Sequence, residues 1–237
     1  MRACIAYSGL NLPALPHLFV EFHGSRAATA TQAELFADLA AEAGATGWRT
    51  SDNASEQNRL WRARHDATWA TKSFWAGREL LVIDVCVPLS ALPGLIEESR
   101  ADMDAQSIEG PRAGHVGDGN FHIGVCIDPA VPGSRDKALA FAYRLARRAI
   151  ALDGTCTGEH WVGAGKIAVA AEERASGLAC AQAIKQALDP LGILNPGKML
   201  PGARHRGNVT GMTFVQAACL LDQTDMGKSA PTRGGKT

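Results

Sequence analysis

The chain has 237 residues, of which 46% are hydrophobic and 20% charged, with 24 basic residues balanced by 24 acidic ones. This composition suits a globular protein with a sizeable core, and the zero net charge without a basic run argues against nucleic acid or an anionic membrane surface as a partner. No apolar run approaches the ~20 residues that a bilayer-spanning helix needs, so we expect no transmembrane segment.

The cysteines and the N-terminus bear on the compartment. Six cysteines are spread along the chain without a C-x-x-C pair, and most lie in apolar runs such as VIDVCVP. That pattern is typical of buried thiols in a reducing compartment, whereas disulfide scaffolds are short and dense in cysteine. The first ten residues show neither the apolar core of a signal peptide nor an Arg-rich transit pattern. The sequence therefore predicts a cytoplasmic protein.

The first part of the chain alternates strand and helix patterns. Residues 16–24 (PHLFVEFHG) place polar residues between apolar ones, which predicts a half-buried strand. Residues 31–44 and 55–73 carry apolar side chains at helical spacing, which predicts a helix over each. Residues 79–88 (ELLVIDVCVP) are almost wholly apolar, as expected of a strand in the centre of a sheet.

The pattern continues in the second part of the chain. A helix is expected over 90–106, with Ser90 as its N-cap. Residues 121–127 (FHIGVCI) alternate apolar residues with others, which predicts a strand that turns His122 away from the apolar face. A long helix is expected over 134–154, then a polar loop and two further helices.

This order of elements favours an α+β fold with an antiparallel sheet, helices packed on one face, and additional C-terminal helices. Residues 1–200 are predicted to form one domain. Residues 201–237 are rich in polar and turn-forming residues, and we expect them to be a disordered tail.

The stretch GHVGDGNFHIGVCI places His115 and His122 on either side of a glycine-rich turn. Two neutral imidazoles and one carboxylate, with a coordination position left open, form the ligand set of a catalytic divalent metal. Glu159, in TGEH, is the candidate carboxylate, and the adjacent His160 is expected to project elsewhere as a separate base. These residues predict a metal site.

Other interpretations of the same residues stay open. Two histidines around a loop are often a surface pair or hydrogen-bonded structural groups, because this spacing does not enforce chelation. Asp118 and Asn120, which lie between them, equally suit a turn.

Several motifs taken together are more specific than any one of them. GHVGDGNFH, GTCTGEH and LDPLGILNPGKML occur in this order, with LFVEFHGS, RLWRARHDA and DVCVPLSALP before them. From about Ala3 to Pro201 the chain resembles the C-terminal cap domain of the FAD-linked D-2-hydroxyacid dehydrogenases, and among these it is most similar to the cytochrome-linked D-lactate type. The resemblance implies a ferredoxin-like cap fold.

The resemblance also implies roles for individual residues. His115, His122 and Glu159 would bind a divalent metal, zinc or manganese, that holds a small 2-hydroxy acid. His160 would accept the hydroxyl proton while a hydride passes to FAD, because imidazole is a base near neutral pH. Arg64, in LWRAR, resembles the arginine that pairs with the substrate carboxylate, whose two oxygens match the guanidinium fork.

Asn120 is a further candidate for a polar substrate contact. GAGK (163–166) is too short for a dinucleotide-binding loop and is expected to turn into the next helix. In the family an N-terminal domain binds most of the FAD, and no such domain is recognised in this chain. Trp161 stands where the family has glycine, so we expect backbone strain if that position requires a positive φ.

Two functions from different classes follow. The first is the substrate and metal half of an FAD-dependent dehydrogenase of a D-2-hydroxy acid, preferably D-lactate, which needs a flavin domain on another chain. The alternative is a truncated, non-catalytic metal-binding or interaction module that keeps the cap fold, and a fragment without function is a third reading. An exposed apolar face towards the flavin domain would favour a separate flavin-domain chain or a homo-oligomer as partner.

Overall fold

The computed structural model describes residues 1–202. The predicted disordered tail, 201–237, therefore lies outside the described residues apart from its first two positions. The chain divides into two compact units. The first comprises Met1–Leu80 with Cys126–Val131, and the second comprises Leu81–Val125 with the described residues from Pro132 onward. The predicted domain boundary at residue 200 stays a prediction.

The first unit is helical. Its helices are α1 (Arg2–Ser8), α2 (Arg26–Glu42), α3 (Ala54–His65) and α4 (Ala67–Phe74). Helix α1 contacts both α3 and α4. The predicted helix at 31–44 corresponds to α2. The single helix predicted over 55–73 is instead two, because Asp66 ends α3 and begins α4 with a backbone ψ of 3°.

The strand predicted at 16–24 is wrong. These residues form no strand in the structure and belong to no sheet of the described residues. Two of the apolar side chains that suggested a buried face are exposed, with Leu18 at 64% and Val20 at 40%. Alternation of polar and apolar residues shows only that a segment could present two faces, and a strand also needs a neighbouring edge with which to pair.

The second unit is built on a three-stranded antiparallel sheet, with strand order β1-β3-β2. Its strands are β1 (Glu79–Cys86), β2 (Arg112–Ala113) and β3 (Asn120–Ile127). Strand β2 pairs with β3 so that Ala113 lies opposite His122. The helices of this unit are α5 (Leu92–Ala105), α6 (Ser134–Ala151), α7 (Ile167–Glu173) and α8 (Leu178–Leu188), with short 3-10 helices η1 (Leu89–Ala91) and η2 (Val116–Asp118).

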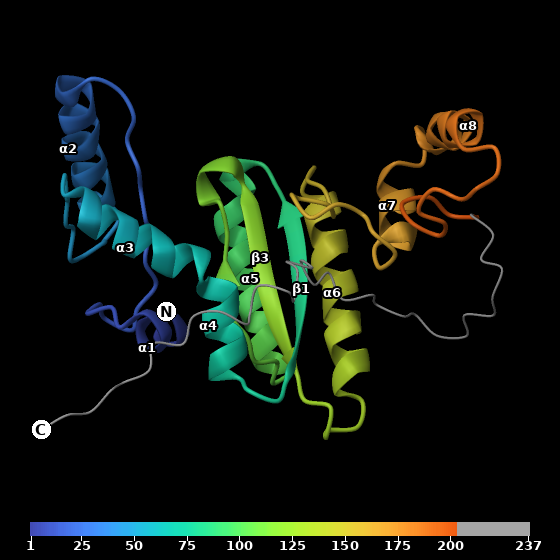
Figure 1. Ribbon diagram of the computed structural model, residues 1–237, viewed down its shortest axis with the longest axis horizontal. Helices are drawn as coiled ribbons and strands as arrows, with labels where there is room; N and C mark the ends of the chain where they lie inside the picture. The colour runs from blue at the N-terminus through green and yellow to red at the C-terminus, as the bar shows by residue number, and fades with distance from the viewer. Residues whose placement is uncertain (203–237) are drawn as a thin grey trace, which may run out of the picture. The chain divides into compact units, whose positions relative to one another are not determined.

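The two faces of this sheet differ in chemistry. Ile83 and Val85 on β1, and Ile123 and Val125 on β3, are at most 3% exposed and form a core with apolar residues of α5 and α6. Figure 1 shows both helices running along the strands, and they contact each other. Successive residues of a strand point to opposite faces, so the even-numbered residues Asp84 and His122 lie on the other face. The predicted α+β fold is confirmed.

Two details of the sequence interpretation need correction. Ser90 is not an N-cap, because it lies inside η1 and α5 begins at Leu92 with Ala91 before it. A proline in the first turn suits this start, since its missing N–H would have had no partner there. None of the five cysteines within residues 1–202 forms a disulfide; Cys156 is buried, Cys180 is exposed, and the other three are half-buried. The prediction that most of the thiols are buried is therefore largely wrong. The cytoplasmic location stays a prediction.

Within residues 1–202, no helix combines the length and the hydropathy needed to cross a membrane.

Candidate metal centre

A tight turn between β2 and β3 brings the first two histidines together. The backbone oxygen of His115 accepts hydrogen bonds from the N–H groups of Asp118 and Asn120, at 2.9 and 3.2 Å. Gly119 has a φ of 74° and lies so close to the Val87 carbonyl that a Cβ would collide with it, so glycine is required here. The chain then enters β3, and the rings of His115 and His122 lie 6.1 Å apart.

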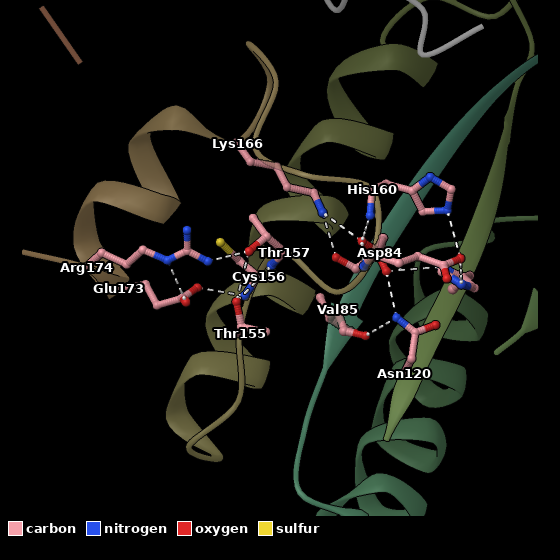
Figure 2. A network of polar contacts seen from close by, with 12 residues as sticks. Asp84, Val85, Asn120, Thr155, Cys156, Thr157, His160, Lys166, Glu173 and Arg174 are labelled. Atoms are coloured by element: carbon pink, nitrogen blue, oxygen red, sulfur yellow. Dashed lines mark hydrogen bonds and ion pairs between the residues drawn. The ribbon is translucent and has the colours of Figure 1, made fainter. Parts of the chain in front are cut away.

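The loop that carries the carboxylate is fixed at its start to the end of β1. Thr155 exchanges two backbone hydrogen bonds with Cys86, of 2.7 and 3.1 Å. The Cys156 N–H donates to Glu173 Oε2 on α7 at 2.8 Å, a contact visible in Figure 2. Burial, together with the Glu173 carboxylate, raises the pKa of the Cys156 thiol to about 12. The thiol is therefore inert and serves to anchor the loop.

The end of the loop is anchored by packing. Val162 and Cys156 are buried in one cluster with residues of α6 and α7. With both ends held, the residues between them, Gly158 to Trp161, pass over the polar face of the sheet.

Glu159 lies among three imidazoles. Its Oε1 is 3.0 Å from His122 Nε2 and 3.2 Å from His160 Nε2, and its Oε2 is 3.5 Å from His115 Nε2. One ligand atom each from His115, His122 and Glu159 can be chosen so that all three lie within 4.8 Å of one another. The structure thus brings together the three predicted ligands. It does not turn His160 elsewhere, as the sequence interpretation expected.

The donors fit a small divalent ion. Two ligands at about 2.05 Å from a tetrahedral zinc ion are about 3.3 Å apart. The distances from Glu159 to His122 and His115, 3.0 and 3.5 Å, are close to this value, and all three ligand atoms lie within 4.8 Å of one another. Imidazole and carboxylate donors suit zinc and manganese, whereas thiolate would select softer metals. The nearby Cys86 does not offer a thiolate, because burial and the neighbouring Asp84 and Asp118 raise its pKa.

Asp84 is a residue of the site that sequence reasoning missed. Its side chain is 1% exposed, and its Oδ2 accepts the N–H groups of Glu159 and His160, each at 2.8 Å. Its Oδ1 accepts from Asn120 Nδ2 at 2.9 Å and lies 3.3 Å from His122 Nδ1. The signal in the sequence was an aspartate inside an otherwise apolar strand, since a buried carboxylate must have polar partners.

The charge of Asp84 is held by these partners. Burial alone would raise its pKa, but the contacts with His122, the His160 N–H, Asn120 and Lys166 outweigh burial and hold the pKa well below its usual range. Lys166 donates from Nζ to the Asp84 backbone oxygen at 2.6 Å, and Figure 2 shows it beside the carboxylate. The polar face of the sheet therefore carries an ionised carboxylate on strand β1.

The remaining predicted residues have different positions. Asn120 is 6% exposed, and its amide donates to Asp84 and to the Val85 carbonyl, which gives it a structural part. Its contact with substrate stays a prediction. Arg64 lies on α3 in the first unit and is half-buried. Its pairing with a substrate carboxylate also stays a prediction.

Trp161 has the strained backbone that its place in the motif suggested. Its φ is 67°, and its side chain is largely exposed. The indole Nε1 donates to the Met199 sulfur at 3.0 Å, and the Met199 N–H in turn donates to the Gly163 oxygen at 2.9 Å. These contacts hold the indole against Met199. Trp161 directly follows Glu159 and His160 in the sequence.

An open pocket of about 330 Å³ adjoins the ligand cluster. Its lining residues are Cys86, His115, Asp118, Asn120, Gly158 and Glu159. This volume would admit a small organic acid. None of these lining residues is a lysine or an arginine, so the lining itself supplies no cation for a carboxylate.

The sheet, its helices and the cluster on its polar face define an α+β domain with a candidate divalent-metal centre. Residues 1–199 match the family described as FAD linked oxidases, C-terminal domain. The chain belongs to this family.

Named relatives agree with this membership. The chain is 40% identical to a probable mitochondrial D-lactate dehydrogenase of Danio rerio over 84% of its own length and 40% of the relative. It is 36% identical to a mitochondrial D-lactate dehydrogenase [cytochrome] of Arabidopsis thaliana over 85% of its length and 36% of the relative. The chain thus spans about two fifths of the length of these curated relatives.

A solved structure is similar in fold. The 4-ethylphenol oxidase of Gulosibacter chungangensis superposes with a TM-score of 0.51 at 22% identity, over 75% of this chain and 37% of that one. The structural likeness supports the cap fold that the sequence predicted.

Proposed function

We propose that this chain supplies the substrate and metal half of an FAD-dependent oxidation of a D-2-hydroxy acid, with D-lactate as the preferred substrate. The observation that carries the proposal is the convergence of His115, His122 and Glu159 beside an open pocket. Membership of the FAD-linked oxidases and relatives named D-lactate dehydrogenase support the reaction and the substrate class.

The residues of the site have different roles in the proposed reaction. His115, His122 and Glu159 would hold the ion. A divalent ion supplies the acidity of a bound hydroxyl, and FAD supplies the acceptor for the hydride from C2. His160 takes the proton of the C2 hydroxyl, which suits a side chain that is about half exposed and whose ring centre lies 5.2 Å from that of His122.

The substrate carboxylate needs a cation. The residues that line the pocket offer none, and Arg64 is the predicted partner. A guanidinium can bind both carboxylate oxygens at once, which fixes the orientation of C2 as well as adding affinity.

Calorimetric titration of D-lactate into the chain, with and without bound Mn²⁺, tests the proposal. We expect D-lactate to bind the metal-loaded chain and not the metal-free chain. Arg64→Ala should weaken that binding about 10-fold or more without changing the affinity for Mn²⁺, because a charge-assisted pair is lost. Arg59→Ala, on the same helix, is the matched control.

Two results would contradict the proposal. The first is D-lactate binding that is independent of the metal. The second is metal binding with no affinity for any 2-hydroxy acid, which would favour a non-catalytic metal-binding module instead.

A further inference from the structure

We infer that Asp84 is the positioning residue of the metal centre, because it fixes the tautomer of His122 and docks the Glu159 loop onto the sheet. This inference rests on the metal centre of the proposed function and names a residue outside its ligand set. Asp84 contacts substrate in no step of the reaction and acts through the ligands.

The first link joins Asp84 to a metal ligand. His122 Nδ1 is a buried atom that makes no aligned hydrogen bond within the described residues, and Asp84 Oδ1 lies 3.3 Å from it. The other ring nitrogen, Nε2, faces Glu159 at 3.0 Å. A proton on Nδ1 facing a carboxylate leaves Nε2 with its lone pair free, which is the form that binds metal.

The second link joins Asp84 to the loop. Oδ2 accepts the consecutive N–H groups of Glu159 and His160, at 2.8 Å each. Two donors on one oxygen fix the orientation of the backbone from which both side chains leave. A Cβ at Gly158 would collide with Asp84 Oδ1 and Asn120 Nδ2, so glycine is what allows the loop to come this close.

The third link is to the turn that separates the two histidines of the cluster. Asn120 follows this turn, and its Nδ2 donates to Asp84 Oδ1 at 2.9 Å. One buried carboxylate therefore contacts both chain segments that provide the ligands. Figure 2 shows Asp84 between His160, Lys166 and Asn120.

A positively charged side chain also lies near the Asp84 carboxylate. Lys166 Nζ lies 3.8 Å from Asp84 Oδ2 and belongs to the turn that leads into α7. Both oxygens of the Asp84 carboxylate thus accept hydrogen bonds, and a cation lies nearby. The donors belong to the loop that carries Glu159 and to the start of β3, and the positions of these two segments determine whether the three ligands converge.

Asp84→Asn makes a sharp test because it keeps the shape of the side chain. If the amide oxygen retains the two loop N–H groups, the amide nitrogen faces His122 Nδ1. A donor at that place favours the tautomer with the proton on Nε2, which leaves no lone pair on the nitrogen that faces Glu159 and so disfavours metal binding there. We expect the affinity for Zn²⁺, measured by calorimetry with a competing chelator, to fall about 10- to 100-fold.

Two comparisons separate positioning from general loss of structure. Asp102→Asn removes a partly buried carboxylate of the same unit, and it should leave Zn²⁺ affinity unchanged. Long-range proton–nitrogen correlation spectra of the metal-free wild type, in alkaline buffer, report which nitrogen of His122 carries the proton, with His122→Gln used for assignment. We expect Nδ1 in the wild type and Nε2 in Asp84→Asn.

The spectrum of the wild type decides the inference even if Asp84→Asn does not fold. A wild-type proton on Nε2 would overturn it, and so would an Asp84→Asn chain that binds Zn²⁺ as tightly as the wild type. The spectra are recorded without metal and therefore test the effect of Asp84 on the His122 tautomer independently of metal binding. A wild-type chain that binds no metal would contradict the proposed function, but it would leave this test of Asp84 intact.

Discussion

Trp161 has an unusual backbone conformation for its residue type. A φ of 67° costs a non-glycine residue of order 1 kcal/mol, because Cβ approaches the backbone carbonyl. The indole recovers little by burial, since 66% of the residue is exposed. Its contact with Met199 is the visible compensation.

Replacing Trp161 by glycine should therefore stabilise the fold relative to replacing it by alanine. Both variants lose the indole, but only alanine keeps the Cβ in the left-handed region. We expect the free energy of unfolding of Trp161→Gly to exceed that of Trp161→Ala by about 1 kcal/mol, measured by urea denaturation. Equal stabilities, or a more stable alanine variant, would contradict the assignment of strain.

Sequence reasoning named three residues that the structure brings together, His115, His122 and Glu159, but it missed Asp84, which contacts His122 and Glu159. Their role as metal ligands stays a prediction. His115, His122 and Glu159 lie in short sequence motifs that can be recognised without a structure. The contact of Asp84 with the Glu159 N–H joins positions 75 residues apart, and no local pattern encodes it. The direction of His160 likewise depends on that contact, which explains why the expected separation from Glu159 was wrong.

Glycines decide how closely the loop approaches the sheet. Gly158 is in contact with Asp84 and Asn120 and has no room for a Cβ, whereas Gly117, in the turn between the histidines, has open space around it. The two residues belong to the same cluster of segments but differ in their surroundings.

Gly158→Ala should displace the loop and weaken metal binding, while Gly117→Ala should not. Overpacking at such a site costs about 1 to 3 kcal/mol, so we expect the Zn²⁺ affinity of Gly158→Ala to fall about 10-fold or more. Calorimetry on both variants checks this. An effect of equal size in both would show that the tight contact at Gly158 is not what places Glu159.

Helices α5 and α6 are joined by a partly buried carboxylate. The Asp102 side chain, 9% exposed, accepts two hydrogen bonds from Arg144, at 2.8 and 3.0 Å, and pairs with Arg148 at 2.8 Å. The hydrogen bonds from Arg144, opposed by burial and aided by Arg148, lower the pKa of Asp102. This pair of helices covers the apolar face of the sheet and so supports the site from behind.

Asp102→Asn should lower the free energy of unfolding by about 2 kcal/mol at neutral pH, because charge-assisted hydrogen bonds are lost. The folded pKa lies below the unfolded value of ~3.9, so the stabilisation is present above that value and declines as the pH falls through the folded pKa. Urea denaturation at neutral and acid pH measures both. A difference between wild type and variant that stays constant down to acid pH would contradict the part played by ionised Asp102.

Elements with a strong, self-contained pattern were predictable. Strands β1 and β3 and helix α6 lie close to where apolar periodicity placed them, because each has one face in the same core. The expected central position of residues 79–88 is wrong, because β3 lies between β1 and β2 in the described sheet. Residues 16–24 and the break at Asp66 were not predictable. Whether residues 16–24 form a strand depends on a neighbouring strand with which to pair, and the break at Asp66 depends on a local turn. Neither feature produces a periodic pattern in the sequence.

Several large apolar side chains on helix α8 and just after it, in the second unit, are exposed. Helix α8 buries none of its residues. The exposed residues on it and just after it are between 56% and 81% accessible: Ile184, Leu188, Leu191, Ile193 and Leu194. An apolar surface of this kind favours association with another protein surface.

We expect the isolated chain to self-associate in sedimentation velocity experiments at micromolar concentration. A double variant, Leu188→Glu with Leu191→Glu, should shift the population towards monomer, while Leu89→Glu, an exposed leucine outside this group, should not. A wild type that sediments as a single monomeric species would contradict the prediction.

The central claim is that His115, His122 and Glu159 form one divalent-metal site. The most direct measurement is the stoichiometry and affinity of Zn²⁺ and Mn²⁺ binding by calorimetry for the wild type, His122→Ala and the control His23→Ala, whose side chain is 81% exposed. We expect one ion per chain in the wild type and in His23→Ala, and a loss of affinity of at least about 100-fold in His122→Ala. Metal binding that His122→Ala leaves unchanged, or a wild type that binds neither ion, would contradict this claim.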